Sequence, residues 1–107
     1  MINVNHQTVG GLVTEILFGR EPMPWMCITV KTEAHVWDRT GRRAKVWCKE
    51  AVILQGSENV AATKALVRKG SYVFATGQRV PAYSVANEAR LRGAVLLAST
   101  FQLQGDV

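Results

Sequence analysis

Two tryptophans, Trp37 and Trp47, flank a strongly basic stretch of this chain. Residues 37–49 contain one carboxylate, Asp38, and five cations: Arg39, Arg42, Arg43, Lys45 and Lys49. An indole ring offers a flat face on which an unpaired base can stack, and lysine and arginine attract phosphates without reading sequence. The composition therefore suits a surface for bases and phosphates.

The spacing of these residues indicates which way they point. If residues 45–49 form a strand, Lys45, Trp47 and Lys49 lie on one face, because successive side chains alternate between faces. Val46 and Cys48 then lie on the other face. The pattern predicts a tryptophan on the polar side of a strand, among cations.

Residues 28–37 also place a tryptophan on the polar side of a predicted strand. Their apolar residues alternate with polar ones, which predicts a strand with one apolar face. That face holds Ile28, Val30, Ala34 and Val36. The opposite face holds Lys31, His35 and Trp37, so the other tryptophan is also in phase with a cation.

A single tryptophan on a strand more often packs in a core or an oligomer interface. Two of them, each in phase with cations, favour binding of single-stranded nucleic acid without sequence specificity. The alternative is a protein-interaction module, in which the aromatic side chains dock a partner and the cations surround them. Trp25 lies on the same predicted strand face as Trp37. The sequence leaves its role open between stacking and packing.

Length and charge fit one nucleic-acid-binding domain. The chain has 107 residues, enough for one modest core, so we expect a single domain over residues 1–107. A net charge of +5 and an isoelectric point near 9.7 suit a polyanionic partner. The start resembles no secretory leader and no stretch is apolar enough to span a membrane. We therefore expect a cytoplasmic, nucleoid-associated protein with no membrane partner.

Little in the sequence points to catalysis or to a cofactor. The eight carboxylates are dispersed, and neither a nucleophile motif nor a glycine-rich phosphate loop occurs. Cys27 and Cys48 lack metal-ligand or disulfide spacing, and His6 and His35 add no cluster. We expect no enzyme activity, no metal and no cofactor, and we expect both cysteines to be buried or half-buried free thiols.

The order of elements predicts an all-β fold. We expect strands at about 9–18, 25–37, 43–55 and 71–78 and a fifth near the C-terminus, with a short helix from Ser57 to about Lys69. Ser57 is the expected helix cap, and Gly77 is expected to mark a bulge. Three strands, a helix and two strands is the order of the five-stranded OB-fold barrel, which suits oligonucleotides.

Two further patterns make specific predictions about the core. The helix is expected to bury one stripe made of Val60, Ala61, Ala65 and Leu66. The fifth strand is expected to bury Leu91, Val95, Leu97, Phe101 and Leu103 on a single face. Arg90, Arg92, Thr100 and Gln102 are then expected on its outer face.

Residues 69–78, KGSYVFATGQ, resemble the segment after the helix in bacterial single-stranded DNA-binding proteins. Ile28-Thr29-Val30 and Trp37-Asp38-Arg39 are similar to the second strand of that family and to its stacking tryptophan. Residues 47–61 are similar to primosomal replication protein N, a relative without the acidic C-terminal tail of the larger family. The resemblance covers roughly residues 25–78.

That resemblance implies stacking roles for Trp37 and Trp47 and an aromatic position near the DNA path for Phe74. It also implies a homodimer or homotetramer that acts in DNA replication, recombination or repair, including replication restart. The expected ligand is single-stranded DNA, with RNA as an alternative, and replication or repair proteins are candidate partners. The full set of candidate binding residues is Trp37, Trp47, Phe74, Lys31, Arg39, Arg42, Arg43, Lys45, Lys49, Arg90 and Arg92.

Overall fold

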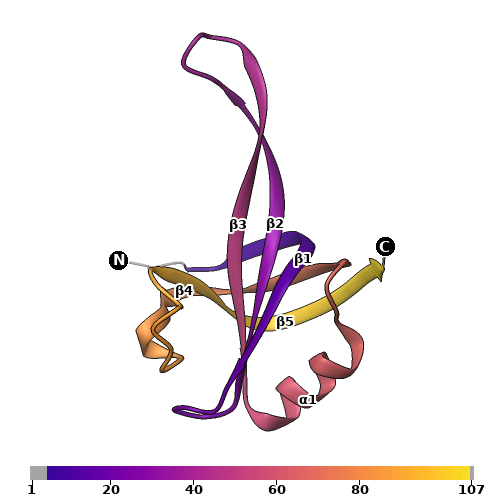
Figure 1. Ribbon diagram of the computed structural model, residues 1–107, viewed down its shortest axis with the longest axis vertical. Coiled ribbons are helices and arrows are strands. Elements are labelled where there is room, and N and C mark those ends of the chain that lie inside the picture. The colour runs from indigo at the N-terminus through magenta and orange to yellow at the C-terminus, as the bar shows by residue number, and fades with distance from the viewer. Residues whose placement is uncertain (1–4, 107) are drawn as a thin grey trace.

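The computed structural model describes residues 5–106 and shows a closed barrel of five strands (Figure 1). The elements are β1 (Gln7–Gly19), β2 (Trp25–Trp37), β3 (Arg43–Gln55), helix α1 (Ser57–Leu66), β4 (Ser71–Pro81), the 3-10 helix η1 (Ala82–Ser84) and β5 (Ala94–Asp106). Around the barrel the strands follow the order β1-β2-β3-β5-β4, and β4 also pairs with β1. This arrangement confirms the predicted OB-fold, with one short helix between the third and fourth strands.

Two hydrophobic clusters hold the barrel together. The first contains residues from all five strands, among them Val13, Ile28, Val52, Val73 and Leu96, and fills the interior. The second lies on the outer side of β2 and β3, where the segment after β4 covers the barrel wall. It contains Trp25, Cys27, Ile53, Ala82, Val85, Ala86 and Val95. One end of β2 and β3 is therefore buried on both faces.

Trp25 belongs to this second cluster and is not a stacking residue. Its side chain is 1% exposed, and its indole Nε1 donates a hydrogen bond of 2.9 Å to the Glu21 carbonyl. The indole lies directly against Gly19, where any added Cβ would clash with it. The question that the sequence left open is thus settled in favour of packing.

The predicted single buried face of the fifth strand is wrong, and a bulge explains why. Thr76 pairs with Thr100 and Gly77 pairs with Ala98, so Ser99 is an extra residue in β5. Because of this extra residue, odd-numbered side chains before and after Ser99 lie on opposite faces of the strand. Val95 and Leu97 therefore join the outer cluster, whereas Phe101 packs on the interior one. The register shift between Thr76 and Gly77 confirms the bulge predicted at Gly77, although the extra residue lies in β5. A Cβ on Gly77 would lie 1.9 Å from the Leu97 carbonyl oxygen, so the two backbones approach closely there.

The other predictions for this strand fail in part. Leu96, placed on the outer face by simple alternation, is 0% exposed, and Leu103 is 37% exposed. Leu91 does pack against the outer cluster, but it precedes β5 and belongs to a loop. Arg90 and Arg92 lie in the same loop and not on the strand.

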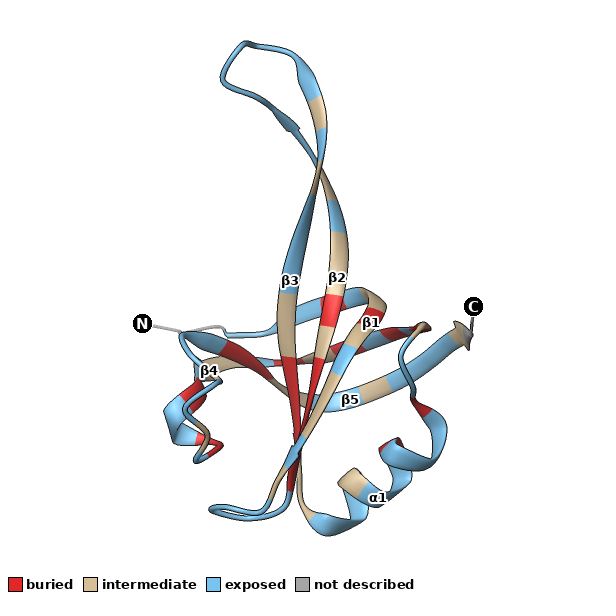
Figure 2. Cartoon of the chain, viewed as in Figure 1, coloured by how far each residue is buried: buried red, intermediate tan, exposed pale blue. Residues whose placement is uncertain are grey.

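Helix α1 buries less than its sequence predicted. Only Thr63 is buried and Val60 is half-buried, whereas Ala61, Ala65 and Leu66 are exposed. Gly56 occupies the N-cap position, so Ser57 is the first helical residue, and no side chain caps the helix. The expected apolar stripe is wrong, because most residues of the helix are exposed to solvent and Thr63 is the one that is buried (Figure 2).

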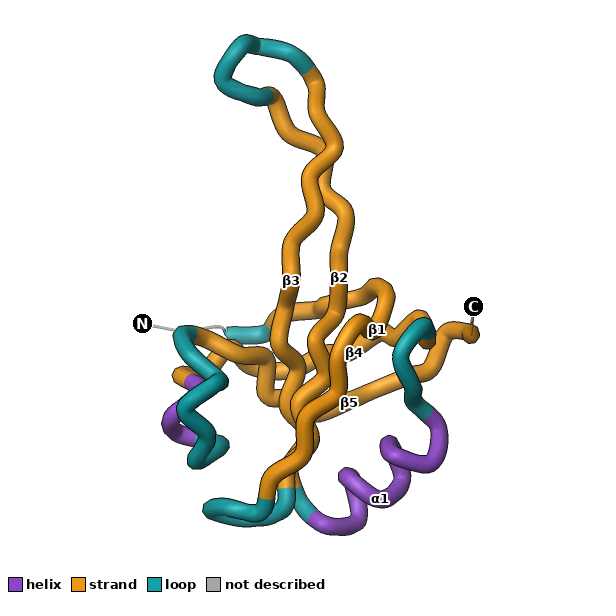
Figure 3. Tube along the Cα trace, in the orientation of Figure 1, coloured by secondary structure: helices purple, strands orange, loops and turns teal. Residues whose placement is uncertain are grey.

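The distal halves of β2 and β3 leave the barrel as a two-stranded hairpin (Figure 3). None of residues 31–49 is buried, in contrast to the barrel halves of the same strands (Figure 2). The hairpin thus has no layer of its own chain on either face. Both strand boundaries, 25–37 and 43–55, agree with the prediction.

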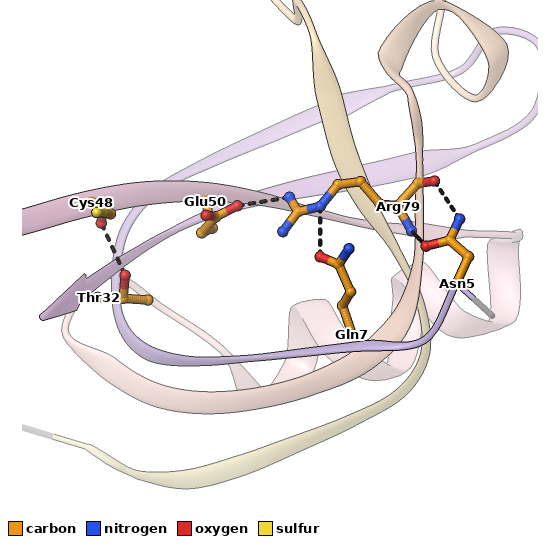
Figure 4. A network of polar contacts seen from close by, with 6 residues as sticks. All are labelled: Asn5, Gln7, Thr32, Cys48, Glu50 and Arg79. Carbon is orange, nitrogen blue, oxygen red and sulfur yellow. Dashed lines mark hydrogen bonds and ion pairs between the residues drawn. The ribbon is translucent and has the colours of Figure 1, made fainter. Parts of the chain in front are cut away.

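A polar network fixes the point where the hairpin leaves the barrel (Figure 4). The Arg79 guanidinium on β4 donates to the Glu50 carboxylate on β3 at 2.7 Å and to the Gln7 side chain at 2.9 Å. The Arg79 backbone also exchanges two hydrogen bonds with the Asn5 side chain. These contacts join β3 to β4 and β1 at the root of the hairpin, so Arg79 is a structural residue.

Replacing Arg79 with alanine should lower the free energy of unfolding by about 1–2 kcal/mol, because a partly buried charged hydrogen-bonding group is lost. Amide hydrogen exchange should accelerate most at the hairpin root. Arg90→Ala is the matched control, since it breaks an exposed ion pair with Glu88 that joins no two strands. Equal rates of amide hydrogen exchange at the hairpin root in the two variants would contradict this role for Arg79.

The two cysteines differ in environment, contrary to expectation. Both are free, but Cys27 is buried whereas Cys48 is exposed on the hairpin. Burial, with a smaller contribution from Glu15, raises the pKa of the Cys27 thiol from 9.0 to about 11. The prediction of a buried or half-buried thiol holds for Cys27 and is wrong for Cys48, because the apolar face of the hairpin has nothing packed on it.

A thiol reagent at pH 8 should therefore modify Cys48 rapidly in the native protein and Cys27 only after unfolding. Mass spectrometry of digested protein would identify the modified residue. Rapid native modification of Cys27 would contradict the burial described above.

Candidate nucleic-acid interface

The register of β2 and β3 collects the aromatic and charged side chains of the hairpin on one face. Directly opposite pairs in an antiparallel ladder share a face. The pairs are Lys31 with Lys49, Glu33 with Trp47, His35 with Lys45 and Trp37 with Arg43. We call the face formed by these eight residues the stacking face.

Both tryptophans of the stacking face are open to solvent. Trp37 is 72% exposed and Trp47 is 54% exposed, far from the near-zero exposure of Trp25. Glu33, the partner of Trp47, is four residues from Trp37 along β2, so the two rings are separated by roughly 13 Å at about 3.3 Å per residue. Two different bases of one strand could therefore stack on them at the same time.

Each indole also has cations over its ring. The Lys31 Nζ lies 4.4 Å and the Lys45 Nζ 5.5 Å from the centre of the Trp47 ring. The Arg43 Cζ lies 5.9 Å from the centre of the Trp37 ring. Cation–π contact holds these cations over the ring face in the free protein. A stacking base displaces them from the face, and they can then meet the phosphate next to that base.

Asp38 builds the tip of the hairpin. Its Oδ1 accepts hydrogen bonds from the Thr40 hydroxyl at 2.7 Å, the Thr40 amide at 2.9 Å and the Arg42 amide at 3.0 Å. These bonds, led by that of the Thr40 hydroxyl and followed by that of the Arg42 amide, hold the pKa of Asp38 below its ordinary value. The one carboxylate of the basic stretch is thus engaged with the turn.

Several cations of the hairpin remain available to a ligand. Within the described residues, Arg39, Arg42 and Lys49 are exposed and take part in no ion pair. Lys45 differs, because its Nζ lies 3.1 Å from the Glu33 carboxylate. The stacking face and the tip together carry more cations than carboxylates, in the place where the sequence predicted them.

Phe74 lies apart from the stacking face. It is 43% exposed on β4, a strand that pairs with β1 and β5 and not with the hairpin. Its ring rests on the backbone of Gly10, where a Cβ would come within 3.1 Å of the ring. The structure does not bring Phe74 together with Trp37 and Trp47, so its place on a nucleic-acid path remains a prediction.

The two candidate arginines of the β4–β5 loop also lie outside the hairpin. Arg90 donates two hydrogen bonds to the Glu88 carboxylate, at 2.8 and 3.2 Å. This pairing lowers the pKa of Glu88 and raises that of Arg90. Arg90 lines a surface pocket with Thr29, which shares its β2 face with Lys31. Arg92 is exposed and has no ion pair among the described residues.

The reverse face of the hairpin is uncharged. Thr32, Ala34 and Val36 of β2 lie opposite Cys48, Val46 and Ala44 of β3. Val36 is 39% exposed, and the others are half-buried or exposed. The hairpin is therefore amphipathic, with an apolar face backing the stacking face.

The sequence predicts no role for two residues of this region, Glu33 and His35. A signal is present for both, because they alternate in step with Lys31 and Trp37 and so lie on the same predicted strand face.

Comparison with known proteins gives no match in sequence but clear matches in fold. No protein-family profile matches the chain, and no curated protein matches it significantly. A small single-stranded DNA-binding protein from Streptomyces coelicolor superimposes with a TM-score of 0.70 at 16% identity, covering 97% of this chain and 96% of that one. This chain has the fold of the single-stranded DNA-binding proteins.

Two other solved structures extend the comparison. The single-stranded DNA-binding protein of Plasmodium falciparum, solved in complex with single-stranded DNA, gives a TM-score of 0.68 at 13% identity and 96% coverage of both chains. The protein PriB from Ralstonia solanacearum gives 0.66 at 10% identity, covering 95% of this chain and 99% of that one. The resemblance inferred from the sequence is thus confirmed at the level of fold.

The described residues contain few other functional features. No helix in residues 5–106 is long and apolar enough to cross a membrane. In the same range, no three histidine, cysteine, aspartate or glutamate side chains gather where they could hold a metal ion.

The hydrogen-bonded conformation of the hairpin tip should depend on the charge of Asp38. Because its folded-state pKa is lowered, the bonds it accepts stabilise the tip above its ordinary pKa of 3.8 and are lost as pH falls through the folded value. Amide resonances of Thr40 and Arg42 should shift together in that acidic range. Asp38→Asn should remove this transition and leave that of Glu88; an unchanged transition would contradict the assignment.

Proposed function

We propose that this protein binds single-stranded DNA without sequence specificity along the stacking face of its β2–β3 hairpin. The proposal rests on one observation, the two exposed indoles on a single face, each with a cation over its ring. A hairpin that leaves the barrel is open to a flexible strand, since no other part of the described chain covers it (Figure 1).

Binding would combine two physical contributions. Each base that stacks on an indole contributes roughly 1–3 kcal/mol, whatever its identity, because every base has a flat π face. Lys31, Lys49 and the tip arginines attract the phosphates and release counterions, so the affinity falls as salt is added. Neither contribution reads base edges, which is why we expect no sequence specificity, and RNA is an alternative ligand.

The biological setting we infer is DNA replication, recombination or repair, including replication restart, in the cytoplasm. The names of the structural neighbours support the single-stranded DNA on which such a role depends, since they include single-stranded DNA-binding proteins. We further propose that the protein acts as a homodimer or homotetramer and that it has no catalytic activity of its own. Replication and repair proteins are its candidate partners.

A protein-interaction module is the second candidate function. The observation that favours it is the uncharged reverse face of the hairpin, with Val36, Val46 and Ala34 open to a partner. An apolar surface of this kind suits a protein better than a polyanion. This candidate differs from the module expected from the sequence, in which the aromatic side chains dock the partner, because here the partner docks on the reverse face. The two functions then use opposite faces and give different results with nucleic acid.

Titration with oligo(dT) should quench the tryptophan fluorescence at low salt, and duplex DNA of equal length should quench it far less. Trp47→Ala should weaken binding by roughly 1–3 kcal/mol without unfolding the protein, because one stacking ring is lost. The logarithm of the affinity should fall linearly with the logarithm of the salt concentration.

Phe18→Ala is the matched control for this experiment. Phe18 is 46% exposed, and the Lys64 Nζ lies 5.3 Å from its ring centre. Like Trp47, it is therefore an exposed aromatic residue with a lysine over its ring, but it lies next to α1 and outside the hairpin. Its loss should leave the affinity unchanged. Absence of quenching in the wild type at low salt would refute the function and favour the interaction module.

A further inference from the structure

Glu33 is the one carboxylate on the stacking face, and it lies where a negative charge is least expected. It pairs with Trp47 across the hairpin, between Lys31 and His35 on its own strand. Its Oε1 lies 3.1 Å from the Lys45 Nζ and 3.4 Å from the His35 Nε2. A single carboxylate oxygen thus meets two nitrogen donors beside a stacking ring.

This geometry is that of a small anion site. The Lys31 and Lys45 ammonium groups lie over the Trp47 ring, at 4.4 and 5.5 Å from its centre, so a base that stacks on this face displaces them toward the edge of the ring. The phosphate of a stacked nucleotide must lie near that edge. A carboxylate oxygen and a phosphate oxygen make the same charge-assisted hydrogen bonds to lysine and imidazolium.

We propose that Lys45 and His35 form a phosphodiester-binding site next to Trp47, and that Glu33 occupies it in the free protein as an intramolecular stand-in for the phosphate. The inference rests on the function proposed above and adds a ligand, His35, and an internal competitor, Glu33. When a strand binds, its phosphate displaces the carboxylate from Lys45 and His35.

The exposure of the groups makes this exchange feasible. The side chains are 57% exposed for His35, 53% for Lys45 and 38% for Glu33, so water replaces each contact as it breaks. Exposed ion pairs of this kind are weak and sensitive to salt. The pairing is therefore easily displaced by a polyanion that also gains a stacked base.

The groups that face the His35 imidazole come from two strands: Glu33 and Trp37 on β2, and Arg43, Lys45 and Trp47 on β3. No third element of the described chain packs on this face. A phosphate can therefore reach both Lys45 and His35 from solvent.

Glu33→Gln is the direct test, because it removes the competing charge and keeps the shape of the side chain. It should tighten oligo(dT) binding about two- to fivefold at about 50 mM salt, and the gain should shrink as salt rises. Glu58→Gln is the matched control, the same change at an exposed position on α1, and should leave the affinity unchanged. Unchanged or weaker binding by Glu33→Gln would overturn the inference.

A variant of His35 gives the second test. His35→Ala should weaken oligo(dT) binding about two- to fivefold at about 50 mM salt, because one hydrogen-bond donor to the phosphate is lost. The imidazole nitrogen resonances of His35 should also shift when oligo(dT) is added, which a side chain off the path would not show. Unchanged binding by the variant, or resonances that do not move, would overturn the inference.

The design separates this inference from the function on which it rests. If the wild type fails to bind single strands at low salt, the proposed function fails and the site fails with it. If the wild type and Glu58→Gln bind equally and neither arm gives its expected result, the function stands and the phosphate site alone is refuted.

Discussion

The cross-strand register of β2 and β3 is the constraint on which the rest of this molecule depends. Thirteen consecutive pairs, from Trp25 with Gln55 to Trp37 with Arg43, set which side chains share a face. A slip of one residue would move the whole set of one strand to the other face. Trp47 would then lie among Ala34 and Val36, and the charges would be divided between both sides of the hairpin.

This register is fixed at the two ends of the hairpin, because its middle has no core. At the root, Arg79 ties Glu50 to the barrel, and at the tip Asp38 closes the turn. A two-stranded ribbon without a packed layer is only marginally stable in water. The barrel therefore provides the stability, and the hairpin provides an accessible surface.

The charges on the stacking face oppose the folding of the hairpin and favour binding to a polyanion. Lys31 and Lys49 are directly opposite, an arrangement of like charges that destabilises a strand pair. Glu33 reduces the positive charge of the same face by pairing with Lys45. In the proposed function the same carboxylate is unfavourable once phosphates bind, so the stability of the free hairpin and its affinity for a polyanion conflict at this position.

Local pattern alone determined the order of elements, the OB-fold, the bounds of β2 and β3 and the exposure of Trp37 and Trp47. These follow from alternation within single strands and from turn residues next to them. The sequence could not decide what depends on distant segments: the extra residue Ser99 that reverses the parity of β5, the slight burial of α1, and the burial of Trp25 under the segment after β4. It also could not separate Phe74 from the stacking face or join Glu33 to Lys45, because only the closure of the barrel and the pairing of β2 with β3 place these side chains relative to one another.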